Sequence, residues 1–571
     1  MAEKYDLIIR GGTVVDGDGG AMFESDVAIT DGRISTIGRV EGQGHEEIDA
    51  RHRMVMPGFV DLHTHYDAQA TWATQITPSS CNGVTTVLMG NCGVGFAPVH
   101  PEHRDMLISL MEGVEDIPEV VMQEGIPWTW ESFDGYLETL AKREFDVDVA
   151  TQVPHAPLRV YVMGERGANR EPATAEDRAA MAELAADGIK AGAFGFSTSR
   201  LLQHRTGAGN LVPSYGAAEE ELIEIANAVA AVGRGWIQVV GDYGEAIDQE
   251  FGLLCRLVEC SGRPLTFSLL QKDAAPDQWR ELLKRVAEKN ARGLPIMAQI
   301  RGRPTSTLMG WELSENPFLG CGSWADLQGL SIERRIEVLR DPGFRARIIA
   351  EPGGSPAQIK RLREWDRVFR FRDPPQYEPE PGTSVGAVAR DRGVDAAGLA
   401  YDWLMEKNGR AILYHPMTNY AGGDMAPVYE MLSHPNTLIG LGDGGAHVGI
   451  MCDATDMAHA LTHWTRDRTR GPKLAVEEVV RRLTSANAEA IGLTDRGRIS
   501  VGMKADINIV SYDNLRLRLP EVHYDLPAGG KRLLQRSEGF DATIVAGVPV
   551  WRHGEATGAL PGRLLRSGEM H

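Results

Sequence analysis

Cysteine is scarce in this chain, and long apolar runs are absent. Six cysteines are spaced irregularly along 571 residues, so a disulfide framework like that of small secreted domains is not expected. No apolar run approaches the ~20 residues that span a bilayer, and residues 1–6 lack the charged-then-apolar pattern of a signal peptide. These absences predict a cytoplasmic protein with no membrane partner.

Positive charge is also in deficit. Lysine and arginine total 59 against 79 acidic residues, a net charge of −20. Phosphates would be repelled, which argues against nucleic acid or an anionic membrane as a partner. Hydrophobic residues make up 43% and charged residues 24%, as in ordinary globular proteins. The length allows a large barrel and a second module.

Short β-type segments separated by turns occupy residues 5–56, and the same pattern returns in residues 504–551. Asp31-Gly32 is a strong hairpin signal within the first stretch. Neither piece is long enough to form a good core alone. We therefore expect residues 1–56 and 495–571 to form one small β-sandwich built from both chain termini.

Between the two ends, apolar β-type runs alternate with helical stretches, the pattern of a parallel sheet with helices outside it. Residues 57–494 are therefore predicted to form an α/β fold, a (β/α)8 TIM-like barrel with its active site at the C-terminal ends of the strands. The expected helices include 176–191, 219–232 and 277–291. The candidate strands are 59–65, 85–92, 147–154, 193–198, 236–241, 265–271, 294–300 and 438–443.

Residues 301–400 interrupt this alternation with several prolines and glycines and with clustered charges. An insertion of this length inside a barrel is more often functional than not. A covering lid, a surface excursion and an oligomer contact all remain open for it.

His63-Thr64-His65 follows the apolar residues 59–62 at the end of the first candidate strand. Residues two apart on a strand project from the same face, so both imidazoles can converge on one point. A pair of neutral imidazoles suits a divalent transition metal such as zinc. The motif predicts a metal site.

Asp443 ends the last candidate strand, which is the neighbour of the first in a closed barrel. Two imidazoles and one carboxylate leave a coordination position open for water, the pattern of catalytic zinc. The metal would lower the pKa of that water, and Asp443 could take up its proton if one carboxylate oxygen stays free. Cys92 ends the second candidate strand and is either a metal ligand, a bridge between two metals or a buried structural cysteine.

Several motifs resemble the amidohydrolase superfamily: residues 11–16, 57–65 and 497–506, with the late Asp443. Residues 83–93 and 191–198 resemble its N-acyl-D-amino-acid deacylase (D-aminoacylase) branch. The resemblance implies zinc-dependent amide hydrolysis, a barrel, a small β-sandwich and a mobile lid. It also implies a cysteine as metal ligand, which favours that role for Cys92.

The chain departs from this branch at two strands. The branch carries one histidine at the end of the fifth strand and His-His-Lys at the end of the sixth, whereas residues 236–243 and 267–272 contain no histidine. Lys272 is the candidate for the branch's lysine, one place along. A single metal held by His63, His65 and Asp443, with or without Cys92, is therefore expected, and a second metal remains open.

Other polar residues near the expected strand ends are candidates for substrate contacts. His155 matches a histidine of the family's Gly-His-x-x-Leu-Arg segment and is expected to hydrogen-bond the substrate or steady an oxyanion. His447 follows Asp443 by four residues and is a candidate ligand, proton shuttle or substrate contact. A substrate carboxylate would suit an arginine fork. The further candidates are Arg200, Arg301, Arg303, His204 and His415.

The sequence thus predicts a metal-dependent amidohydrolase that cleaves the amide of a small N-acylated substrate such as an N-acyl-D-amino acid. One alternative keeps the site and changes the bond, to that of a cyclic amide, lactone, urea-type compound or dipeptide. A second alternative is a non-catalytic relative that uses the barrel for binding or assembly. A homo-oligomer is compatible with each of these.

Overall fold

Eight parallel strands alternate with helices through the middle of the chain, in a computed structural model that describes residues 4–569. Every pairing between neighbouring barrel strands is parallel. The α/β fold class is confirmed. Counting the interrupted third strand once, the strands are β6 (Phe59–Asp61), β7 (Val84–Met89), β8 and β9 (Asp148–Thr151, Val153–Pro154), β10 (Gly195–Ser199), β11 (Trp236–Val240), β12 (Leu265–Ser268), β13 (Ile296–Ile300) and β17 (Thr437–Ile439).

The first and last strands meet just beyond their ends. Thr64 and Gly444 form a parallel bridge. The Asp443 N–H donates to the His63 carbonyl at 2.8 Å, and the His65 N–H donates to the Gly444 carbonyl at 2.8 Å. The segments after β6 and β17 therefore lie side by side, as the barrel prediction requires.

Helices between these strands begin and end close to the predicted bounds. The three predicted ones are α7 (Ala175–Ala191), α8 (Glu219–Ala231) and α10 (Gln278–Asn290). A capping box starts α7, since the Thr174 side chain accepts from the Asp177 N–H and the Asp177 carboxylate accepts from the Thr174 N–H. The others around the site are α2 (Arg104–Glu115), α5 (His155–Met163), α9 (Ile247–Ser261), α16 (Ala426–Ser433), α18 (Val476–Leu483) and α19 (Ser485–Ala490).

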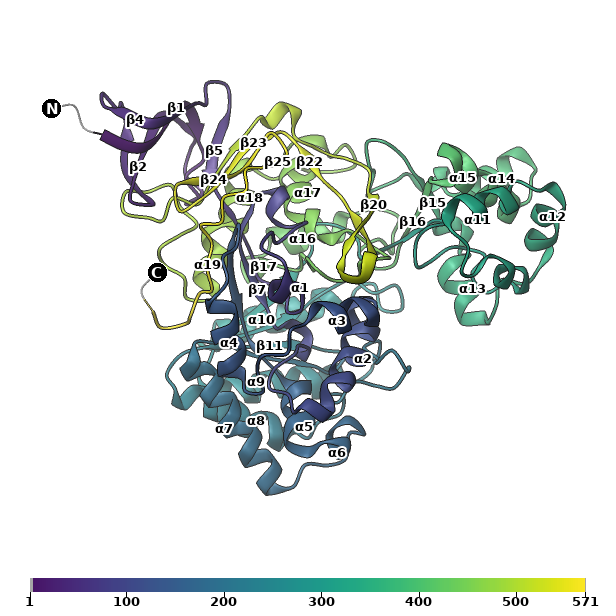
Figure 1. Cartoon of the computed structure of the whole chain (residues 1–571), viewed down its shortest axis with the longest axis horizontal. Coiled ribbons are helices and arrows are strands. Elements are labelled where there is room, and N and C mark those ends of the chain that lie inside the picture. The colour runs from purple at the N-terminus through teal and green to yellow at the C-terminus, as the bar shows by residue number, and fades with distance from the viewer. Residues whose placement is uncertain (1–3, 570–571) are drawn as a thin grey trace.

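Strands from both chain ends share one sheet, where the first and last parts of the chain run side by side (Figure 1). The joint is the antiparallel pair β5 (Met54–Pro57) and β18 (Ile507–Val510). The predicted hairpin turn is present, with positive φ of 51° at Asp31 and 71° at Gly32. The remaining strands are β1 (Lys4–Val14), β2 (Phe23–Thr30), β3 (Arg33–Gly38), β4 (Gln43–Asp49), β23 (Phe540–Val545), β24 (Val548–Arg552) and β25 (Glu555–Ala556). The bounds assigned to the two domains stay a prediction.

The insertion between β13 and β17 is a largely helical subdomain with its own hydrophobic core, which contains Trp311, Phe318, Trp324 and Leu404. Its helices stand to one side of the rest of the chain (Figure 1). The role of a lid stays a prediction. The elements are β14 (Ser306–Met309), α11 (Ile332–Leu339), α12 (Pro342–Ala350), α13 (Pro356–Leu362), β15 (Phe369–Phe371), α14 (Val385–Arg392), α15 (Ala396–Gly409) and β16 (Ile412–Pro416).

The loop that follows Asp443 is held by the insertion and by a hairpin near residue 530. Leu308 and Ser314 of the insertion donate backbone N–H groups to the carbonyls of Ile450 and Gly449, at 2.8 and 3.1 Å. Leu533 donates to the Val448 carbonyl at 2.6 Å, from the hairpin formed by β20 (Glu521–Leu526) and β21 (Gly530–Leu534).

All six cysteines are free. In the part of the chain that the structure describes, none of the helices combines the length and the apolar character that crossing a bilayer requires. The sequence-based expectation of a homo-oligomer stays a prediction.

Candidate metal centre

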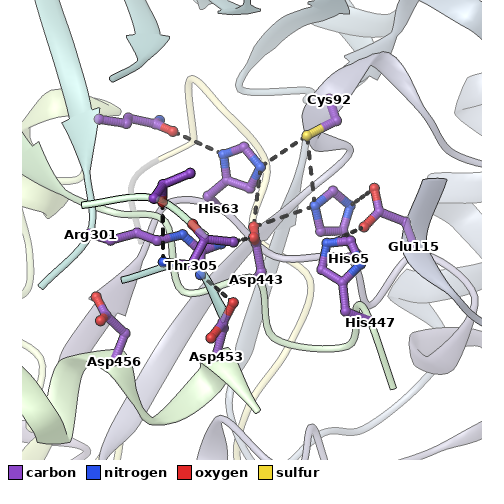
Figure 2. A network of polar contacts seen from close by, with 12 residues as sticks. His63, His65, Cys92, Glu115, Arg301, Thr305, Asp443, His447, Asp453 and Asp456 are labelled. Atoms are coloured by element: carbon purple, nitrogen blue, oxygen red, sulfur yellow. Dashed lines mark hydrogen bonds and ion pairs between the residues drawn. The ribbon is translucent and has the colours of Figure 1, made fainter. Parts of the chain in front are cut away.

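Donor atoms of His63, His65 and Cys92 lie within 4.8 Å of one another beyond the first and second barrel strands, and Asp443, beyond the last strand, faces the two histidines (Figure 2). The His63 Nε2 atom lies 3.2 Å from Cys92 Sγ and 3.5 Å from Asp443 Oδ1. The His65 Nε2 atom lies 3.9 Å from the same sulfur and 3.7 Å from the same oxygen. The structure thus brings together all four residues that the sequence analysis selected as metal ligands.

The distances from the two Nε2 atoms to the Cys92 sulfur and to the Asp443 oxygen are close to those between neighbouring ligands of one small cation. Zinc bonds to nitrogen, oxygen and sulfur of about 2.0–2.3 Å place neighbouring ligand atoms roughly 3.3–3.8 Å apart in a tetrahedron. The four measured distances run from 3.2 to 3.9 Å. A mixed set of two imidazoles, one sulfur and one carboxylate oxygen is typical of zinc rather than of calcium or magnesium.

Three side chains at the site are carried by backbone in the left-handed region. The φ angles are 56° at Cys92, 42° at Asp443 and 52° at His447. Residues other than glycine adopt this region at a cost on the order of 1–3 kcal/mol, and such strain gathers at functional sites. The neighbouring Gly93 has φ of 68°, and a Cβ there would lie 2.9 Å from Thr198 Cα. A turn this tight is what aims the Cys92 sulfur at the two histidines.

The other ring nitrogen of each histidine faces a side-chain oxygen. His63 Nδ1 lies 2.9 Å from Gln299 Oε1, a distance at which the Nδ1–H donates to the amide oxygen. His65 Nδ1 lies 3.3 Å from Glu115 Oε1. The bond at His63 Nδ1 leaves its Nε2 as a lone-pair donor for a metal. Burial lowers the pKa of His65, but the charge of Glu115 and the contacts with Asp443 and Cys92 outweigh burial and raise that pKa well above its usual value, so His65 must release a proton to bind a metal.

Arg301 holds the far oxygen of Asp443. Its guanidinium pairs with Asp443 Oδ2 and with Asp453, and it is 3% exposed. Burial alone would raise the pKa of Asp443, but the charges of Arg301 and the imidazoles outweigh burial and hold that pKa well below its usual range. Asp443 is therefore ionised, with Oδ1 toward the cluster and Oδ2 toward Arg301.

Burial sets the protonation of the other donors in the metal-free protein. It lowers the pKa of His63 to about 4, so this ring is neutral at neutral pH, as a ligand must be. It raises the pKa of Cys92 to about 12. Binding of a metal by Cys92 must therefore release the thiol proton.

His155 is not brought to the cluster. Its Nδ1 lies 2.8 Å from the Thr198 hydroxyl and its Nε2 lies 2.7 Å from Glu221, and the residue is fully buried. Arg159 pairs with the same carboxylate. Both ring nitrogens are occupied, which favours a role in positioning over contact with an oxyanion.

The three predicted cations are each already paired. Arg200 makes two bonds to Glu250, of 2.8 and 3.0 Å. Arg303 is 1% exposed, contacts Asp453 and lies over the Tyr377 ring at 4.1 Å. Lys272 pairs with Asp242 at 2.7 Å. Binding of a substrate carboxylate by any of them would have to displace or share these partners.

His447 lies beside the cluster and is partly open. Its Nε2 atom lies 3.7 Å from Glu115 Oε2, and its side chain is 25% exposed. His204 is close enough for the charges of His447, His65 and Asp443 to act on it, although burial is the largest cause that lowers its pKa, to about 3. Its Nδ1 lies 2.8 Å from the Ser199 hydroxyl. His415 is elsewhere, with Nδ1 bonded to the Arg361 carbonyl.

A small cavity of about 20 Å³ adjoins the centre, lined by Asp443, Ala446, Arg532 and Leu533 among others. A much larger cavity of about 850 Å³ lies between the insertion and the β20–β21 hairpin, and its lining contains none of the four donors. Of the four donors, Asp443 alone lines the small cavity.

Sequence reasoning missed Glu115 and Gln299. Glu115 follows the apolar positions Leu107, Met111 and Val114 on the buried side of α2, and a charged residue in such a stripe is a signal that could have been used. Gln299 is a fully buried amide inside the parallel strand β13. An uncompensated polar residue in a buried strand is a comparable signal.

The ends of the fifth and sixth strands, β11 and β12, offer no imidazole. The ion pair of Asp242 and Lys272 occupies this region. Among the residues that the structure describes, His63, His65 and Cys92 are the one group of three or more possible metal-binding side chains within such reach of each other. The geometry therefore favours a single metal position.

Comparison with known proteins identifies the family of this chain. The model of the amidohydrolase family matches residues 46–551. Two relatives from Alcaligenes xylosoxydans xylosoxydans, a D-aminoacylase and an N-acyl-D-aspartate deacylase, are each 26% identical over 99% of this chain, with 98% and 96% of their own lengths covered. A crystal structure of D-aminoacylase aligns with a TM-score of 0.65 and 25% identity, covering 98% of this chain and 100% of that one. The resemblance seen in the sequence is confirmed: the chain belongs to the amidohydrolase family and is a hydrolase of carbon–nitrogen bonds other than peptide bonds.

Proposed function

We propose that this protein hydrolyses the amide bond of N-acyl-D-amino acids at a mononuclear zinc centre. The observation that carries the proposal is the group formed by His63, His65 and Cys92 beyond the strand ends, with Asp443 facing the two histidines. The D-aminoacylase and the N-acyl-D-aspartate deacylase that align over nearly the whole chain support the substrate class.

The donor set fits zinc in number, type and spacing. His63 and His65 would hold the ion through Nε2 and Cys92 through its thiolate, which leaves a coordination position open for water. A zinc ion bound there supplies Lewis acidity, which makes water a nucleophile at neutral pH and polarises the amide carbonyl.

Asp443 Oδ1 is the carboxylate oxygen that faces the cluster, because Arg301 holds Oδ2. In our proposal this oxygen accepts the proton of the attacking water and returns it to the leaving amine. Arg301 keeps the carboxylate ionised and therefore ready to accept. His447, partly exposed beside the centre, contacts the bound substrate.

The test uses metal-stripped enzyme titrated with zinc and assayed on matched N-acetyl-D- and N-acetyl-L-amino acids, both acidic and neutral. We expect activity to reach its maximum near one equivalent of zinc and to favour the D series. D443N should keep the fold and lose activity by about 100-fold or more, since a positioned proton-transfer group contributes 10²–10⁴-fold.

A second candidate keeps the centre and changes the bond, to that of a cyclic amide, lactone, urea-type compound or dipeptide. It is favoured by the absence of imidazoles at the ends of β11 and β12, where Lys272 instead pairs with Asp242. Zinc-loaded enzyme that cleaves a cyclic amide or lactone and leaves every N-acyl-D-amino acid intact would establish this second function and overturn the first.

A further inference from the structure

Glu115 breaks two local rules of helix construction. It is the last residue of α2, where a negative charge opposes the helix dipole. It is also 1% exposed, and burial of a carboxylate is costly unless it is paired. Burial raises its pKa accordingly. A residue that is unfavourable in its own helix is expected to serve a function elsewhere in the site.

The two oxygens of Glu115 face two different histidines. Oε1 lies 3.3 Å from His65 Nδ1, and Oε2 lies 3.7 Å from His447 Nε2 (Figure 2). Neither Glu115 Oε1 nor His65 Nδ1 has a hydrogen-bond partner of proper geometry in the described structure. These two buried polar atoms face each other and have no other partner. We infer that they form a proper hydrogen bond when the His65 ring coordinates a metal.

We propose that Glu115 is a positioning residue for the metal centre, holding the His65 ring for coordination and fixing His447 beside it. This inference rests on the proposed function and deepens it. The carboxylate accepts from the His65 Nδ1–H and makes the Nε2 lone pair more basic. Its other oxygen limits the movement of the His447 ring, so one buried charge couples a metal ligand to the residue that meets the substrate.

Removal of the side-chain charge should leave the local backbone in place. The His447 N–H donates to the Glu115 carbonyl, and the Gly449 N–H donates to the Asp116 carboxylate at 3.1 Å. Neither bond uses the Glu115 side chain. E115Q therefore separates the role of the carboxylate from the attachment of the loop.

The decisive measurement is zinc affinity, by competition with a chromophoric chelator, for the wild type, E115Q, E115D and D105N. Loss of an outer partner of a metal-bound histidine typically weakens metal binding 10–100-fold, and we expect this for E115Q. E115D keeps the charge and should recover part of the loss. Asp105 is an exposed acid on the same helix, so D105N should bind zinc as the wild type does.

Melting temperatures of the metal-free proteins show whether each variant is folded. Folded E115Q with affinity within twofold of the wild type would overturn the inference while leaving the proposed function intact. If E115Q does not fold, E115D is measured in its place. An E115D variant with the zinc affinity and the KM of the wild type would overturn the inference. A wild type that binds no zinc would overturn the proposed function, and this inference with it.

Discussion

Arg301 decides how Asp443 can act. One guanidinium, buried and paired with two carboxylates, fixes the rotation of Asp443 and leaves Oδ1 toward the histidines. Because the ion pair is buried, the cost of desolvating its charges offsets much of their attraction. Its main effect is to orient Asp443 rather than to stabilise the fold. The sequence analysis considered Arg301 for a substrate carboxylate, whereas in the structure its charge is already used inside the protein.

Replacement of Arg301 by methionine should leave Asp443 and Asp453 buried without their cation. Breaking a buried pair by removing one partner costs about 3–5 kcal/mol, and we expect a loss of that size in urea unfolding of the metal-free protein. Arg345 offers a control, because its pair with Asp402 is exposed, with side-chain exposures of 39% and 58%. R345M should cost less than about 1 kcal/mol. Equal costs for the two variants would contradict this account.

The positions of site residues that belong to a local sequence motif could be predicted. The positions of residues that reach the site from a distant part of the fold could not. His63 and His65 stand two apart just beyond β6, and Asp443 lies just beyond β17, so alternation and barrel order place them together. Glu115 lies on a helix between strands, and its contact with His65 depends on how α2 packs. No spacing in the sequence encodes that distance.

Glu221 joins three elements: α8, which carries it, α5 with His155 and Arg159, and β10 through Thr198. Burial raises the pKa of Glu221, but the hydrogen bond from His155 and the charge of Arg159 outweigh it and lower the pKa to about 2. This cluster holds the beginning of α5 against the barrel, one strand away from Cys92.

The lowered pKa of Glu221 predicts a loss of stability in acid. A carboxylate whose folded pKa lies below its unfolded value stabilises the protein above about pH 4.5, and this contribution, about 3 kcal/mol, disappears as the pH falls toward 2. E221Q should therefore be less stable than the wild type at pH 7, with the difference shrinking below pH 4.5. Urea midpoints across this range measure it, and a difference that grows toward low pH would contradict the assignment.

Barrel elements were predicted more completely than those of the insertion. Strands such as β11 and helices such as α7 are long enough for hydrophobic periodicity to define them. The insertion was recognised only as a break in the pattern at 301–400. Its helices α11, α12 and α13 have 8, 9 and 7 residues. A helix of about two turns contains too few apolar positions for its hydrophobic periodicity to be recognised in the sequence.

Binding of zinc at the metal site should increase the free energy of unfolding of the protein. A ligand that binds only the folded state stabilises it by about 2.7 kcal/mol at 100 times its Kd. For a chain of this size we expect zinc to raise the melting temperature by a few degrees or less and EDTA to reverse the change. H63N should show no such shift. A zinc-dependent rise of equal size in H63N would place the binding elsewhere.

The loop from His447 to Ile450 is held by the insertion, by the β20–β21 hairpin and by the end of α2. Its contact to the hairpin comes from Leu533, 470 residues after His63 in a chain of 571 (533 minus 63). Asp443, the last of the four donors, precedes Leu533 by 90 residues (533 minus 443), so a chain emerging from the ribosome carries all four donors before the hairpin that fixes this loop has been made. The centre therefore has its ligands before the hairpin completes the wall beside them.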